Sequence, residues 1–192
     1  MSEPMFHEEG YNNNQLIPAS AWELEKNRTI YLEGEITAEM AMDFRKKLHY
    51  LEARQEPGQA VKVVIDSPGG SVTDGLAIYD AMQGTSLVLD LICFGAAYSM
   101  AAVLLAGGKK GHRFITKHSY VMIHEPRAQA GGGTVSSIEA QAQLGKRFKD
   151  VVNGILAENT GHTLEEIEKV TGSDTYMNAQ EAVAFGIADE AI

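Results

Sequence analysis

Residues 61–70 read Val61-Lys62-Val63-Val64-Ile65-Asp66-Ser67-Pro68-Gly69-Gly70. The first five are mostly β-branched, which predicts a buried strand. The Pro-Gly-Gly sequence that follows is typical of a tight turn. A helical pattern then runs from about Thr73 to Met82, so the stretch predicts a strand, a turn and a helix in direct succession.

The rest of the chain repeats this alternation, which indicates an α/β fold. Further strands are expected at 28–32, 87–94 and 120–123. Further helices are expected after Thr37, from Ser99 to Gly107, from about 136 to 158 behind a glycine triplet, and after Thr163 and Asn178, each of which begins a capping box. We expect a flexible segment at residues 1–20 and a single domain at 21–192.

The composition narrows the class of protein. Of the 192 residues, 44% are hydrophobic and 22% are charged, and the net charge is −10. An acidic chain without a basic run argues against nucleic-acid binding. The longest apolar stretch, Met100 to Ala106, is far too short to span a membrane, and no secretory signal is visible. We expect a cytoplasmic protein, and we expect the short cationic stretch 109–113 to form a solvated turn.

Cysteine and histidine give little sign of a cofactor. The single cysteine, Cys93, cannot form an internal disulfide, and its apolar neighbours favour a buried structural thiol over a nucleophile. His112, His118 and His124 are six residues apart, which is not a metal-ligand spacing. We expect no metal and no cofactor.

Ser99 follows a strand that ends in small residues and begins a short apolar helix. The N–H groups at a helix N-terminus are unpaired and favour negative charge, which suits an oxyanion beside an attacked carbonyl. Serine is also among the commonest helix N-caps, and for Ser99 alone that interpretation is the simpler one.

Three other segments carry possible chemistry. His124 ends a strand, where open α/β folds place their sites, although a structural role is the simpler interpretation. Asp174 lies in a loop between two capped helices and alone is nearly uninformative. The glycine pair before Ser71 can donate backbone N–H groups to an oxyanion or dock a peptide, or it can be a plain tight turn.

Taken together, five segments in order resemble the proteolytic subunit of the Clp protease, the ClpP family. They are residues 63–72, 75–82, 92–101, 121–126 and 174–189. The resemblance runs from about residue 28 to the C-terminus, and five modest matches in register are highly specific.

The resemblance implies a serine endopeptidase with a Ser-His-Asp triad. Ser99 corresponds to the nucleophile, His124 to the general base and Asp174 to the third member. The N–H groups of Gly70 and Met100 correspond to the oxyanion donors. The edge formed by Gly70, Ser71 and Val72 corresponds to the strand that pairs with an extended substrate.

The resemblance also implies the ClpP/crotonase-like spiral of strand–strand–helix units. Two heptameric rings would stack through the long helix near 136–158, which would act as a handle. A hexameric Clp-family ATPase would deliver unfolded polypeptides to the enclosed sites.

This sequence departs from the family pattern at several places. Asn12-Asn13-Asn14 and Trp22 replace a basic, tyrosine-containing stretch, Tyr98 replaces a small residue, and Arg127 replaces an apolar one. These departures favour a divergent paralogue or a phage-associated member. Three alternatives stay open: a phage prohead maturation protease, a crotonase-like acyl-CoA enzyme, and an inactive ring subunit.

Overall fold

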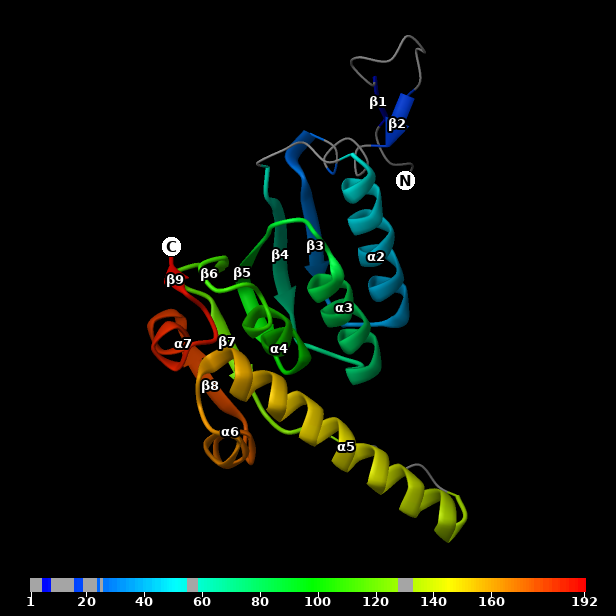
Figure 1. The fold of residues 1–192 in the computed structure, drawn as a ribbon, viewed down its shortest axis with the longest axis vertical. Coiled ribbons are helices and arrows are strands. Elements are labelled where there is room, and N and C mark those ends of the chain that lie inside the picture. Colours follow the sequence, from blue (N-terminus) through cyan, green and yellow to red (C-terminus); the bar gives the residue numbers. More distant parts are fainter. Residues whose placement is uncertain (1–4, 8–15, 19–23, 25, 55–58, 128–132) are drawn as a thin grey trace.

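A computed structural model describes residues 5–7, 16–18, 24, 26–54, 59–127 and 133–192 (Figure 1). Strands β1 (Met5–His7) and β2 (Leu16–Pro18) form an antiparallel pair. Most of the segment expected to be flexible, residues 1–20, lies outside the described residues, as do 12–14 and Trp22.

The remaining strands form one seven-stranded sheet. They are β3 (Thr29–Glu33), β4 (Val61–Ser67), β5 (Leu89–Tyr98), β6 (Arg113–Ile115), β7 (Tyr120–Ile123), β8 (Thr175–Asn178) and β9 (Glu190–Ala191). The main order is β3-β4-β5-β6-β9, and β7 lies between β5 and β8. Every pair is parallel except β7 with β8. Parallel pairing requires crossovers, and the helices supply them.

Six helices in the described part of the chain pack against this sheet or project from it (Figure 1). They are α2 (Ala38–Ala53), α3 (Val72–Gly84), α4 (Met100–Ala106), α5 (Val135–Thr160), α6 (Leu164–Thr171) and α7 (Ala179–Phe185). All seven residues of α4 are buried. A helix that is apolar on every side is stable only inside a core, and α4 holds that position.

Helix α2 shows how the local sequence specifies these elements. The Thr37 side chain caps it by accepting a hydrogen bond from the Met40 N–H at 3.3 Å. Phe44, Leu48 and Leu51 are buried, because residues three and four positions apart share one face of a helix. The expected capping boxes at Thr163 and Asn178 are both present.

The buried strand predicted at 61–65 is present, and it is buried on one face. Val61, Val63 and Ile65 are buried, whereas Lys62 is exposed and Val64 is half-buried. The helices therefore cover one face of the sheet and leave the other open. Large apolar side chains lie on strands of that open face, including Tyr31, Phe94 and Tyr120.

Helix α5 projects from the body of the molecule, and only its C-terminal part packs against other elements (Figure 1). Val152 and Ile155 are buried near its C-terminal end. Leu144 and Val151, by contrast, are 49% and 45% exposed in the single chain. The helix ends at Gly161, whose φ of +85° is the left-handed conformation that favours glycine at this position.

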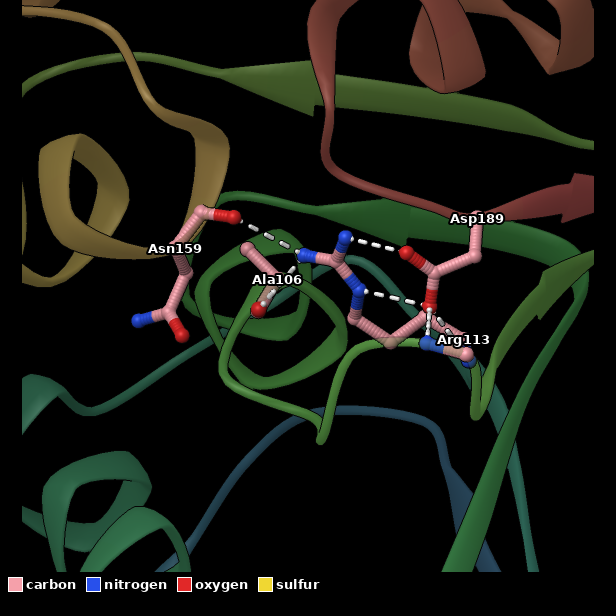
Figure 2. Close-up of polar contacts among 5 residues, drawn as sticks. Ala106, Arg113, Asn159 and Asp189 are labelled. Carbon is pink, nitrogen blue, oxygen red and sulfur yellow. Dashed lines mark hydrogen bonds and ion pairs between the residues drawn. The ribbon is translucent and has the colours of Figure 1, made fainter.

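The prediction of a solvated turn at 109–113 was wrong for Arg113. This residue begins β6 and is 2% exposed. Its guanidinium forms an ion pair with Asp189 and donates to the carbonyl oxygens of Ala106 and Asn159 (Figure 2). A buried guanidinium must have all of its donors satisfied, and these partners come from α4, α5 and the C-terminal segment. Arg113 thus joins three distant parts of the chain.

Candidate active site

The strand register brings Ser99 beside the end of β7. Tyr98 pairs with Met122 in the parallel contact between β5 and β7. Ser99 directly follows, and its N–H donates to the Met122 carbonyl oxygen at 2.7 Å. The nucleophile expected from the sequence therefore lies at the carboxyl ends of two adjacent strands, where α/β sheets usually form sites.

The antiparallel pair β7–β8 positions the other two residues. Ile123 pairs with Thr175, so His124 and Asp174 are the next positions along the same register. The Glu125 N–H donates to the Thr171 carbonyl oxygen at 2.8 Å, which holds the segment after His124 against the loop before Asp174. Residues distant in the sequence thus become cross-strand neighbours.

Ser99 and His124 are in direct contact. His124 Nε2 lies 2.8 Å from Ser99 Oγ, and the His124 side chain is only 10% exposed. Ser99 occupies the N-cap position of α4 but makes no capping hydrogen bond with its side chain. The simpler interpretation of Ser99 as a helix cap is therefore wrong for its side chain, because the hydroxyl faces the imidazole instead.

The backbone of Ser99 has φ +55° and ψ −122°. Apart from Arg28, it is the only non-glycine residue with positive φ in the described part of the chain. Such a conformation costs on the order of 1–3 kcal/mol and persists only where the surrounding structure imposes it. It occurs here in the sharp strand-to-helix turn that presents the hydroxyl, a geometry similar to that of nucleophile elbows.

The second imidazole nitrogen of His124 faces Asp174. Nδ1 lies 3.2 Å from Asp174 Oδ1. Asp174 also accepts two hydrogen bonds from Nη2 of Arg127, at 3.0 Å to Oδ1 and 2.8 Å to Oδ2. The hydrogen bond from Arg127 is the main cause that holds the pKa of Asp174 below its ordinary value, and the contact with His124 acts more weakly in the same direction. The carboxyl group is therefore ionised at neutral pH.

The glycine turn after β4 packs against this group of residues. A methyl group added to Gly69 would lie 2.8 Å from Ser99 Cβ and 3.1 Å from the Met100 nitrogen. Ile36 bridges to this turn: its N–H donates to the Gly69 oxygen at 2.8 Å, and its oxygen accepts from Ser71 N–H at 2.9 Å. In that pattern the N–H and C=O of Gly70 point away from Ile36. Met100 is the first residue of α4, so its N–H has no intrahelical acceptor.

The segment that the resemblance matches to the substrate-pairing strand, Gly70 to Val72, is only partly extended. Ser71 caps α3, because its hydroxyl accepts a hydrogen bond from the Asp74 N–H at 3.3 Å. Val72 is already the first residue of that helix. The extended part of the segment therefore ends at Ser71, and Gly70 is the residue whose backbone groups remain directed outward.

Sequence reasoning missed two features of the site. The contact between Arg127 and Asp174 has only a weak signal, a cation three positions after His124. Strand β8, which sets the position of Asp174, is four residues long and was not predicted.

Several other expectations concern side chains outside this group. Cys93 is buried, and burial raises the pKa of its thiol to about 12. Among the described residues, no cluster of histidine, cysteine and carboxylate side chains could hold a metal ion. No helix among the residues that the structure describes is long and apolar enough to cross a membrane.

A family model described as Clp protease matches residues 14–192, nearly the whole chain. The family expected from the sequence is confirmed, and with it the ClpP-type α/β fold.

Proposed function

This chain belongs to the Clp protease family, and from that premise we propose that it is a serine endopeptidase that hydrolyses peptide bonds of unfolded polypeptides. Ser99 is the nucleophile, His124 is the general base, and Asp174 orients His124 and stabilises its charged form. No metal or cofactor enters the reaction.

The observation that carries the proposal is the 2.8 Å distance between Ser99 Oγ and His124 Nε2. Serine is a weak nucleophile until a neighbouring base removes its proton. The distance lies within hydrogen-bond reach, which is the first geometric requirement for that transfer. The strained backbone of Ser99 supports the same interpretation, because strain of this kind gathers at functional sites.

The reaction would run in two halves. The Ser99 oxygen attacks the carbonyl carbon of the scissile peptide while its proton moves to Nε2 of His124. When the carbon–nitrogen bond breaks, His124 returns that proton to the leaving amine, and an acyl-enzyme remains. Water then attacks the ester with His124 again as base, which releases the acid and regenerates Ser99.

The N–H groups of Gly70 and Met100 would stabilise the negative oxygen of each tetrahedral intermediate. Met100 directly follows Ser99, and Gly70 directly follows Gly69, which packs against Ser99. The Met100 N–H has no intrahelical acceptor, and the Gly70 N–H is directed away from Ile36. Loss of one such donor typically lowers kcat by roughly 10²–10³. An extended substrate would pair with the outward backbone groups of Gly70, with Ser71 and Val72 at the edge of that contact.

The proposed assembly is two stacked heptameric rings that work with a hexameric Clp-family ATPase in the cytoplasm. The projecting helix α5 supports a role as the handle between rings, because its exposed apolar residues, such as Val135 and Leu144, have no partner within the described single chain. The apolar side chains on the open sheet face support contacts between neighbouring copies.

Labelling with a fluorophosphonate probe tests the proposal, because the probe reacts with activated serine hydroxyls. We expect the assembled wild-type protein to be labelled once per chain and Ser99→Ala not to be labelled. Peptide hydrolysis should fall by at least about 10⁴-fold in Ser99→Ala. Absence of labelling in the wild type, or labelling of Ser99→Ala, would overturn the proposal.

Other outcomes would favour the alternatives. Labelling without binding to any Clp-family ATPase would favour a prohead-type protease. An assembled but unlabelled protein would favour an inactive ring subunit. Turnover of an acyl-CoA that survives Ser99→Ala would favour a crotonase-like enzyme, which uses a glutamate near the acyl α-carbon in place of a serine.

A further inference from the structure

The guanidinium of Arg127 lies against the carboxylate that faces His124. Nη2 of Arg127 donates to both oxygens of Asp174, at 3.0 and 2.8 Å. The same Oδ1 lies 3.2 Å from Nδ1 of His124. One carboxylate oxygen is therefore shared between a fixed positive charge and the imidazole.

Asp174 has few other restraints. Its side chain is 40% exposed, and it lies in the short connection between α6 and β8. A carboxylate in such a loop can rotate about its side-chain bonds unless a hydrogen bond holds it. Contact with both oxygens by one guanidinium nitrogen restricts that rotation.

We propose that Arg127 is a positioning residue for catalysis, which holds Asp174 in line with His124. This inference rests on the proposed peptidase function. Loss of the Arg127 contact would leave the carboxylate free to turn away from Nδ1 of His124. The imidazole would then lose the acceptor that fixes its orientation.

The other charged groups around His124 do not replace Arg127. Glu125 follows His124 directly, but its carboxylate is paired with Lys149 Nζ of α5 at 2.6 Å. Lys149 also lies near Glu168 of α6 and Asp150 of α5. These groups, one cation and three anions, are the same in every variant below. Ser99 contacts the opposite imidazole nitrogen and carries no charge while it is protonated.

The test compares kcat and KM for a short fluorogenic peptide between about pH 5 and 9 in the assembled protein. The variants are Arg127→Met, which removes the charge, and Arg127→Lys, which keeps it. Arg45→Met is the matched control, since Arg45 is exposed on α2.

Three readouts separate positioning from other roles. In Arg127→Met, kcat should fall about 3–10-fold while KM changes less than about twofold, because in this proposal Arg127 acts through Asp174 and not on the substrate. Arg127→Lys should restore most of kcat, because it keeps a positive donor for Asp174. In an Asp174→Asn background, Arg127→Met should have no further effect on kcat, because Arg127 acts through Asp174.

The outcomes also separate this inference from the proposed function. A wild type that is neither labelled nor active overturns both. An active wild type whose kcat is unchanged in Arg127→Met overturns the inference alone. So does a change confined to KM, which would mean that Arg127 contacts substrate, and so does an equal loss of activity in Arg45→Met.

Discussion

Gly69 packs so closely against Ser99 that a methyl group added to Gly69 would lie 2.8 Å from Ser99 Cβ and 2.6 Å from the carbonyl oxygen of Tyr98. Neither atom belongs to a flexible side-chain end, so neither can move aside without shifting the backbone. Gly69 also has φ +90°, a conformation that residues with a Cβ rarely adopt. The turn and the proposed nucleophile therefore hold each other in place.

Gly69→Ala should impair both activity and stability. The clash displaces the Ser99 turn, and a displacement of about 1 Å in a catalytic group can lower the rate about 10²-fold. Backbone strain and overpacking together should lower the free energy of unfolding by about 2–4 kcal/mol. Peptide hydrolysis and denaturant unfolding of the assembled protein measure the two effects.

Gly34→Ala is the matched control. Gly34 has φ +83°, and an added methyl group would have nothing within 4 Å. This variant should lose about 1–2 kcal/mol from backbone strain alone and keep its activity. If both variants lose activity equally, close packing at Gly69 does not position Ser99.

Ser99→Gly should be more stable than Ser99→Ala. Both variants lose the hydroxyl and its contact with His124, but only glycine adopts φ +55°, ψ −122° without a steric penalty. Relief of strain exceeds the extra entropy of glycine in the unfolded chain, so the difference should be about 1 kcal/mol. Denaturant midpoints of the two inactive proteins measure it. Equal stability, or a more stable alanine variant, would mean that Ser99 is not strained.

The sequence predicted the elements whose signals are local. The β-branched run of β4 and the capped start of α2 need only neighbouring residues, and both are present. Strand β6 is different, because it has three residues and includes Arg113. Its extended conformation depends on pairing with Leu91 and on the ion pair with Asp189, which lie far away in the sequence.

The same distinction applies to the candidate site. His124 directly follows a predicted strand. Ser99 follows the strand predicted at 87–94, which in the structure extends to Tyr98. Asp174 reaches His124 through β8, whose Thr175 to Asn178 sequence is too short and too polar to indicate a strand alone. Only the family resemblance selected Asp174. The contact between Arg127 and Asp174 had only a weak signal, a cation three positions after His124.

Cys93 should be inert to thiol reagents in the folded protein. Its side chain is fully buried, and burial raises the pKa of the thiol to about 12. The reactive thiolate is therefore scarce below that pH. Iodoacetamide at about pH 8 should leave native Cys93 unmodified and label it after denaturation, as measured by mass spectrometry. Rapid native labelling with loss of activity would instead favour a cysteine nucleophile.

Asp189→Asn should destabilise the fold in a way that depends on pH. Arg113 is 2% exposed, so loss of the partner charge leaves a buried guanidinium uncompensated, at about 3 kcal/mol near pH 7. Burial alone would raise the pKa of Asp189, but the hydrogen bonds from Arg113 outweigh it and hold that pKa below its ordinary 3.8. Urea unfolding at several pH values measures the effect.

The sign of that pH dependence is fixed by the lowered pKa. A carboxyl group whose pKa is lower in the folded state contributes its full stability above the unfolded value and loses it as the pH falls through the folded value. The difference between wild type and Asp189→Asn should therefore be constant above about pH 5 and shrink below about pH 4. Asp43→Asn, which breaks only the exposed Asp43–Lys47 pair, should stay within about 0.5 kcal/mol of wild type. A difference at Asp189 that does not shrink in acid would mean that shape and hydrogen bonding, rather than charge, join β6 to the C-terminal segment.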